Sequence, residues 1–194
     1  MSRKNPSVSE SPIAIDANVF IYAIAPTPRK GDAPSLAAMR LDSRTLIGAH
    51  ARISISAVSL AEVYRGATPA EADAIEKVEG SVGVLQLDRR AVDKARELMK
   101  KRGLVAPKVC VQCHRDARTV QCTKCGVIRS VGDAWHDALI VASVIVDDAI
   151  DSLFTFDGGM LAMADFASQD GVKISRPPNA NGDLFAHAAK KSER

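Results

Sequence analysis

One acidic residue follows a short apolar run in the stretch Ile13-Ala14-Ile15-Asp16-Ala17-Asn18-Val19-Phe20-Ile21-Tyr22. Continuous apolarity predicts a strand that is buried on both faces, as in a parallel sheet. A carboxylate is costly to bury unless it is paired or bound to metal, and ligands bind at the carboxyl ends of strands in open α/β sheets. Asp16 is therefore a candidate functional residue. The structural alternative is that it only caps the following helix.

The spacing of apolar residues predicts strands that alternate with helices along the rest of the chain. The further strands are expected at residues 53–57, 82–87, 152–156 and 172–175. The helices are expected at residues 35–50, 59–66, 68–80, 88–103, 132–145 and 160–166. Such alternation is typical of a parallel sheet with helices on both faces. We therefore expect an α/β fold.

Composition narrows the class of protein. The 194 residues suffice for one domain with a hydrophobic core, and a formal charge of +3 does not by itself indicate a nucleic-acid binder. No apolar run reaches the roughly 20 residues that span a bilayer, and the polar N-terminus lacks the apolar segment of a signal peptide. We expect a cytoplasmic protein without membrane contact. Its four cysteines are then thiols or metal ligands rather than disulfides.

Four acids lie at boundaries of the predicted elements. Asp16 and Asp157 follow strands, and Glu62 and Asp137 lie in the expected first turns of two helices. In a parallel sheet these boundaries gather at one edge, where several carboxylates repel and raise one another's pKa. A divalent cation relieves this repulsion, and Mg²⁺ and Mn²⁺ prefer oxygen ligands. Such a site suits hydrolysis of a phosphodiester.

Each acid also has a purely structural interpretation. Glu62 forms a Ser-x-x-Glu capping box with Ser59. Asp133 and Asp137 lie near a helix start, where the helix dipole favours anions. Asp157 precedes a Gly-Gly pair that is typical of a turn. Spacing alone does not decide between these interpretations and a shared site.

Four short motifs, in this order and setting, resemble those of the PIN-domain family. They are Ile15-Asp16-Ala17-Asn18-Val19-Phe20, Ile55-Ser56-Ala57-Val58-Ser59-Leu60-Ala61-Glu62-Val63, His136-Asp137-Ala138-Leu139-Ile140-Val141-Ala142 and Thr155-Phe156-Asp157. The resemblance covers residues 13–103 and 132–175. It leaves residues 1–12 and 176–194 as expected flexible tails.

The resemblance implies a three-layer α/β/α nuclease that cuts RNA with Mg²⁺ or Mn²⁺. It makes Asp16, Glu62, Asp137 and Asp157 the expected catalytic and metal-binding carboxylates. Supporting roles fall to Asn18 and Thr155, which match polar positions that often support the site, and Asp133, one helical turn before Asp137, is an auxiliary candidate. Many small PIN proteins are VapC-like toxins that are silenced by an antitoxin, so an antitoxin is a candidate partner protein. We also expect a homodimer.

Residues 104–131 interrupt the PIN-like pattern as an insertion that carries two C-x-x-C pairs. The pairs are Cys110 with Cys113 and Cys122 with Cys125. Two such pairs are a strong signature of structural zinc held by four thiolates. Zinc would supply the stability that so short a segment cannot obtain from a hydrophobic core.

Other cofactors and roles for the insertion remain open. Four cysteines can also hold an iron–sulfur cluster, the first pair followed by His114 spells a haem-attachment motif, and a C-x-x-C pair can be redox-active. The basic residues of the insertion either bind phosphates or form a solvated surface; they are Arg115, Arg118, Lys124 and Arg129.

The leading hypothesis is a metal-dependent endoribonuclease, either a toxin of a toxin–antitoxin pair or a nuclease that matures rRNA or tRNA. A second hypothesis is a zinc-containing module that binds nucleic acid without cutting it. A redox protein that uses the cysteines is a third.

Overall fold

The computed structural model describes residues 9–24, 34–67, 69–102 and 131–180. The five strands of these residues form one parallel sheet in the order β3-β2-β1-β4-β5. The strands are β1 (Ile13–Ile15), β2 (Ile53–Ser56), β3 (Gly83–Leu85), β4 (Ser152–Phe154) and β5 (Lys173–Ser175). The predicted α/β fold with a parallel central sheet is therefore confirmed.

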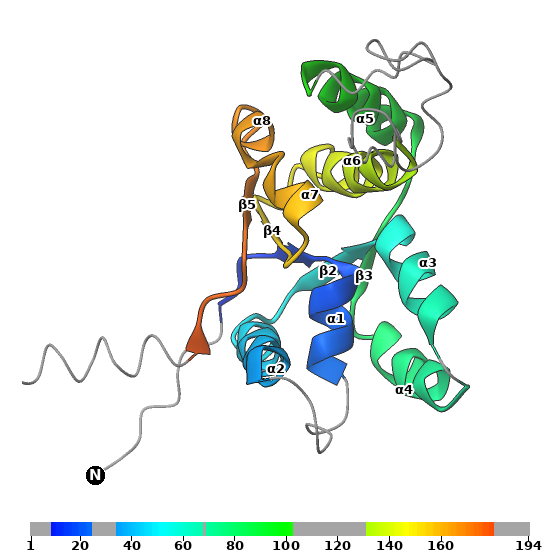
Figure 1. Ribbon diagram of the computed structural model, residues 1–194, viewed down its shortest axis with the longest axis vertical. Coiled ribbons are helices and arrows are strands. Elements are labelled where there is room, and N and C mark those ends of the chain that lie inside the picture. Colours follow the sequence, from blue (N-terminus) through cyan, green and yellow to red (C-terminus); the bar gives the residue numbers. More distant parts are fainter. Residues whose placement is uncertain (1–8, 25–33, 68, 103–130, 181–194) are drawn as a thin grey trace, which may run out of the picture.

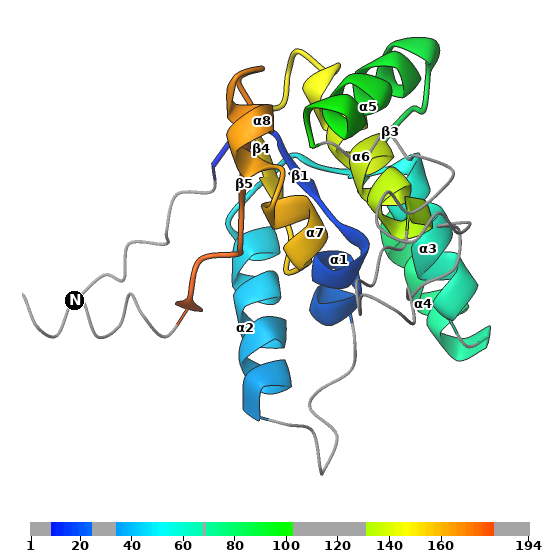
Figure 2. The ribbon, with the colours of Figure 1, turned by 45° about the horizontal axis from the view of Figure 1, so that its top comes forward.

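Helices cover both faces of the sheet (Figure 1). The helices of the first half are α1 (Ala17–Ile24), α2 (Pro34–Gly48), α3 (Ala57–Gly66) and α4 (Pro69–Glu79). Those of the second half are α5 (Arg89–Lys101), α6 (Val131–Ile145), α7 (Gly158–Leu161) and α8 (Ala164–Ser168). Turning the molecule shows α5 and α6 side by side, on the side of the sheet away from α2 (Figure 2).

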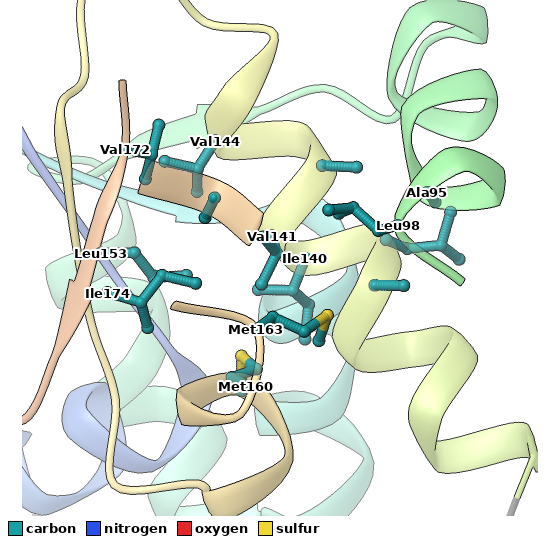
Figure 3. Packing of buried hydrophobic residues seen from close by; sticks show 14 of the residues in the cluster. Ala95, Leu98, Ile140, Val141, Val144, Leu153, Met160, Met163, Val172 and Ile174 are labelled. Carbon is teal, nitrogen blue, oxygen red and sulfur yellow. The ribbon is translucent and has the colours of Figure 1, made fainter. Parts of the chain in front are cut away.

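The side chains of β1 point alternately to the two faces of the sheet, and a separate hydrophobic cluster covers each face. Ala14 faces a cluster built by α5, α6, α7 and α8, in which Leu98, Val141, Leu153 and Met163 are fully buried. Figure 3 shows this packing. Ile13 and Ile15 point the other way, into a cluster formed with Phe20 of α1, Leu46 of α2, Ile55 of β2, Val63 of α3 and Ile75 of α4. β1 is therefore buried on both faces, which explains why all three of its residues are apolar.

The order of the strands places β1 between the two halves of the chain. From β1 the chain moves through β2 to β3 on one side, and β4 and β5 add on the other side. The boundary between β1 and β4 is therefore the point at which the direction of winding changes. Ligands bind at the carboxyl ends of the strands at such a point in open α/β sheets. Asp16 follows β1 at that end, and Thr155 follows β4.

Several predicted bounds need correction. Helix α3 begins at Ala57 rather than Ser59, because the Ser56 side chain is its N-cap and accepts a hydrogen bond from the Ser59 amide. The helix expected at residues 160–166 is two short helices, α7 and α8. The Met163 amide donates to the Met160 carbonyl at the turn between them, and this turn buries both methionines in one core. Helix α5, expected from residue 88, begins at Arg89, because Asp88 is its N-cap and accepts a hydrogen bond from the Ala91 amide.

The described residues before β1 and after β5 are hydrogen-bonded to the rest of the domain. The Ser9 amide donates to the Ala49 carbonyl, and the Ser9 carbonyl accepts from the Ala51 amide. At the other end, the Ala180 amide donates to Asp42 Oδ1 over 2.8 Å. No helix among the described residues has both the length and the apolar content needed to cross a bilayer.

The two leucines Leu98 and Leu87 provide a test of this core. Leu98 is 0% exposed between α5 and α6, whereas Leu87 is 41% exposed after β3. Replacing Leu98 with Ala should lower the free energy of unfolding by about 3 kcal/mol, because it removes buried methyl groups and leaves a cavity. Replacing Leu87 with Ala should change it by less than about 0.5 kcal/mol. Equilibrium denaturation in urea measures both values, and equal losses would contradict the assigned core.

Candidate functional site

The carboxylate of Asp16 lies at the carboxyl end of β1 and is only 2% exposed. Its backbone connects three elements. The Asp16 amide donates to the Phe154 carbonyl of β4 over 3.0 Å, and its carbonyl accepts from the Phe20 amide of α1. The position of Asp16 is therefore set by the sheet itself, and its side chain is left to interact with other elements.

Two hydroxyl groups hold the two oxygens of this carboxylate. The Ser59 hydroxyl donates to Asp16 Oδ1 over 3.0 Å, and the Thr155 hydroxyl donates to Asp16 Oδ2 over 3.1 Å. Each hydroxyl also accepts a hydrogen bond, from the Ser56 hydroxyl at Ser59 and from the Asp157 amide at Thr155. Since each hydroxyl has one proton, this arrangement directs both protons to Asp16. The site is therefore built to receive an ionised carboxylate.

Opposing effects set the pKa of Asp16. The net result is a pKa raised to about 6, chiefly because the buried charged form loses hydration, with a smaller contribution from the negative charge of Glu62. Hydrogen bonds from the Ala17 backbone, Ser59 and Thr155 act in the opposite direction and lower the pKa. The hydroxyl groups thus offset part of the cost of burying a charge.

Asn18 supports the same corner of the site. Its side-chain nitrogen lies 3.5 Å from the Thr155 hydroxyl, to which it donates, and its Oδ1 accepts from the Phe156 amide over 3.2 Å. The expectation that Asn18 and Thr155 lie beside Asp16 agrees with these contacts. Ser59 was interpreted from the sequence only as a helix cap, so its contact with Asp16 was missed.

Asp137 of α6 experiences the charges of the other three acids. Burial is the largest effect and raises its pKa to about 7, and the negative charges of Asp157, Asp16 and Glu62 raise it as well. Arg102, at the end of α5, lowers it. Among the described residues, Asp137 makes no hydrogen bond or ion pair. All four predicted carboxylates are therefore close enough to interact electrostatically around Asp137.

The remaining two acids differ in how firmly they are held. Asp157 caps α7, because its Oδ1 accepts from the Gly159 and Met160 amides. The Gly-Gly pair after Asp157 therefore begins a short helix that Asp157 caps, and this structural role does not exclude a place near Asp137. Glu62 lies on α3 with its Oε1 3.9 Å from His136 Nδ1.

Two local predictions about these acids are wrong. Glu62 lies in the second turn of α3 rather than in the first, because the helix begins at Ala57, and Asp137 lies in the second turn of α6, which begins at Val131. The expected capping box between Ser59 and Glu62 does not form, since Ser56 caps α3. Neither acid is therefore explained by helix capping.

Oxygen donors of this kind fit a hard divalent cation such as Mg²⁺ or Mn²⁺. Hydroxyl groups occupy one acceptor position on each Asp16 oxygen, and each oxygen has capacity for a further interaction. The described residues contain no group of three or more Asp, Glu, His or Cys side chains already arranged to hold an ion. Completing such a set requires movement of a side chain, and the unbonded Asp137 is the one that is least restrained.

Some predicted site residues fall outside this description. Asp133 belongs to α6, but its side chain is not among those that the structure describes. All four cysteines, and with them the predicted zinc module, lie between residues 103 and 130, outside the described part of the chain.

A family model for the PIN domain matches residues 13–165. The chain belongs to the PIN-domain family. Members of this family are generally metal-dependent nucleases, and they typically use Mg²⁺ or Mn²⁺. Comparison with curated protein sequences gives no match.

Comparison with solved structures finds a similarity to a chain in the crystal structure of VapBC2 from Rickettsia felis bound to a DNA fragment from their promoter. That chain is 16% identical in sequence, with a TM-score of 0.47, and the match covers 84% of this chain and 97% of the other.

The raised pKa of Asp137 predicts how stability depends on pH in the metal-free protein. Because the folded state binds this proton more tightly than the unfolded state, the contribution of Asp137 to stability is greatest below about pH 4 and is lost as pH rises to about 7. In a chelator, the Asp137→Asn variant should lose less stability than the wild type between pH 5 and pH 8, by about 2 kcal/mol, since the partly exposed carboxylate keeps some hydration. Urea denaturation at the two pH values measures this difference. Parallel losses in the two proteins would contradict the assigned environment of Asp137.

Proposed function

We propose that this PIN domain is an endoribonuclease that hydrolyses RNA phosphodiester bonds at a Mg²⁺ or Mn²⁺ site. The proposed ligands are Asp16, Glu62, Asp137 and Asp157. The observation that carries this proposal is the mutual repulsion of four carboxylates around Asp137, next to the strand boundary at which ligands bind in this architecture. The choice of RNA rests on the resemblance to PIN nucleases.

A bound divalent cation would supply positive charge for a phosphate oxygen and would make a water molecule more acidic. The protein contributes orientation. Ser59 and Thr155 keep the Asp16 carboxylate in one position and favour its ionised form. Asp157 is held by two backbone amides of α7.

Arg102 is suited to contact the substrate in this mechanism. Its positive charge acts on Asp137, and the residue is partly exposed. Guanidinium groups recognise phosphates well. We propose that Arg102 helps to hold the RNA backbone beside an otherwise acidic site.

The Asp16→Asn variant tests the proposed activity. Removing the charge should reduce Mg²⁺-dependent RNA cleavage by roughly a hundredfold or more, because a direct ligand is lost. Asp137→Asn should have the same effect without breaking a hydrogen bond among the described residues. Cleavage of labelled RNA, with and without chelator, measures both effects.

Asp148→Asn provides the matched control for these two variants. Asp148 is exposed and lies beyond the opposite end of α6, so its loss should leave cleavage unchanged. Circular dichroism establishes that all three variants are folded. Full activity in folded Asp16→Asn and Asp137→Asn would refute the assignment, and RNA binding by the wild type without cleavage would favour the alternative of a binding module.

We propose a toxin of a toxin–antitoxin pair as the biological form of this activity, with maturation of rRNA or tRNA as the alternative. The two make different demands on partners. A toxin requires a protein that binds it and blocks cleavage, whereas a maturation nuclease requires a defined cut in a precursor RNA. We also propose that the protein is a homodimer.

We further propose that Cys110, Cys113, Cys122 and Cys125 bind one structural zinc ion. The support is the paired C-x-x-C spacing. Elemental analysis of purified protein should find one zinc per chain, and replacing Cys110 and Cys113 with Ser should reduce the zinc content to near zero. Iron with sulfide in place of zinc would identify an iron–sulfur cluster instead and would overturn the proposal.

A further inference from the structure

Gly159 occupies the first turn of α7, between two of the proposed metal-binding carboxylates. Its amide donates to Asp157 Oδ1. The only positive φ among the described glycines is at Gly171, so the backbone at residue 159 does not itself require glycine. The reason for a glycine here is therefore to be sought in the space around it.

That space is filled by acid oxygens. A side-chain methyl group at residue 159 would overlap Asp137 Oδ2 and would lie 2.9 Å from Asp157 Oδ1. The neighbouring Gly158 is different, because a methyl group there would meet no heavy atom within 4 Å. Of the two adjacent glycines, only Gly159 has no room for a side chain.

Other contacts hold α7 and Asp157 in place, so Asp137 is the group that relieves the overlap most easily. The side chain of Met160 is 3% exposed and is buried in the core with Met163 (Figure 3). Asp157 is restrained by hydrogen bonds from the Gly159 and Met160 amides. Asp137, in contrast, makes no hydrogen bond among the described residues, so a methyl group would displace the Asp137 carboxylate.

We propose that Gly159 is a positioning residue: its missing side chain provides the space in which the Asp137 carboxylate approaches Asp157 closely enough for the two to bind the same divalent cation. This inference rests on the proposed function and names a further requirement of the same site. It differs from a turn requirement, which Gly158 and Gly159 would share.

The proposal predicts opposite effects on stability and on metal binding in Gly159→Ala. Alanine has the higher helix propensity, and displacement of Asp137 reduces its repulsion with Asp157, so the Tm of the metal-free protein should stay equal or rise. The dissociation constant for Mn²⁺ should increase by about tenfold to a hundredfold, as is usual when the support of a metal ligand is removed. Isothermal titration of the full chain with Mn²⁺ measures affinity, and thermal denaturation in chelator measures Tm.

Gly158→Ala is the matched control. It adds the same methyl group one residue earlier, into open space, and should leave Mn²⁺ affinity unchanged. Wild-type affinity in Gly159→Ala would overturn the role of Gly159 while leaving the nuclease proposal intact, provided that the wild type binds Mn²⁺ and cleaves RNA. Equal losses of affinity in the two variants, or a clear drop in the Tm of Gly159→Ala, would indicate a purely structural role and would also overturn it. A wild-type chain that neither binds Mn²⁺ nor cleaves RNA would refute the proposed function and this inference together.

Discussion

A buried carboxylate at the centre of the sheet is the constraint on which the rest of the site depends. Asp16 is fixed to β1 and hydrogen-bonded to β4 through its backbone, and a charge in that position is costly without hydrogen-bond donors. Ser59 and Thr155 supply those donors from α3 and from the end of β4. One side chain thus connects three elements that are distant in sequence.

Burial and mutual repulsion also make the ionised forms of Asp16 and Asp137 destabilising to the folded protein. The pKa of Asp16 is raised to about 6 and that of Asp137 to about 7, in both cases chiefly by burial, with repulsion between acids adding to it. Nothing in the hydrophobic packing requires four acids at this edge. A cost of this kind is expected at functional sites, where charged groups are kept because their chemistry is needed.

Topology explains why the acids meet. The parallel order β3-β2-β1-β4-β5 brings all strand ends to one edge and leaves a change of direction between β1 and β4. Helices α3 and α6 then approach this edge from the two core clusters and bring Glu62 and Asp137 with them. Asp157 and Gly159 complete the edge because α7 begins immediately after β4. A sheet with another strand order would separate these residues.

The amino-acid sequence by itself was sufficient to predict the alternation of strands and helices and the parallel sheet, because apolar periodicity is a local feature of the chain. Local spacing also explains the errors. Ser59 was paired with Glu62 three residues away, whereas its hydroxyl contacts Asp16, which is 43 residues distant, and Gly159 was interpreted as part of a turn, whereas its surroundings are set by Asp137 of another helix. Only the tertiary structure decided which hydroxyl groups hold the buried charge and where a methyl group does not fit, because such contacts form between segments whose distance in space cannot be obtained from their spacing in the chain.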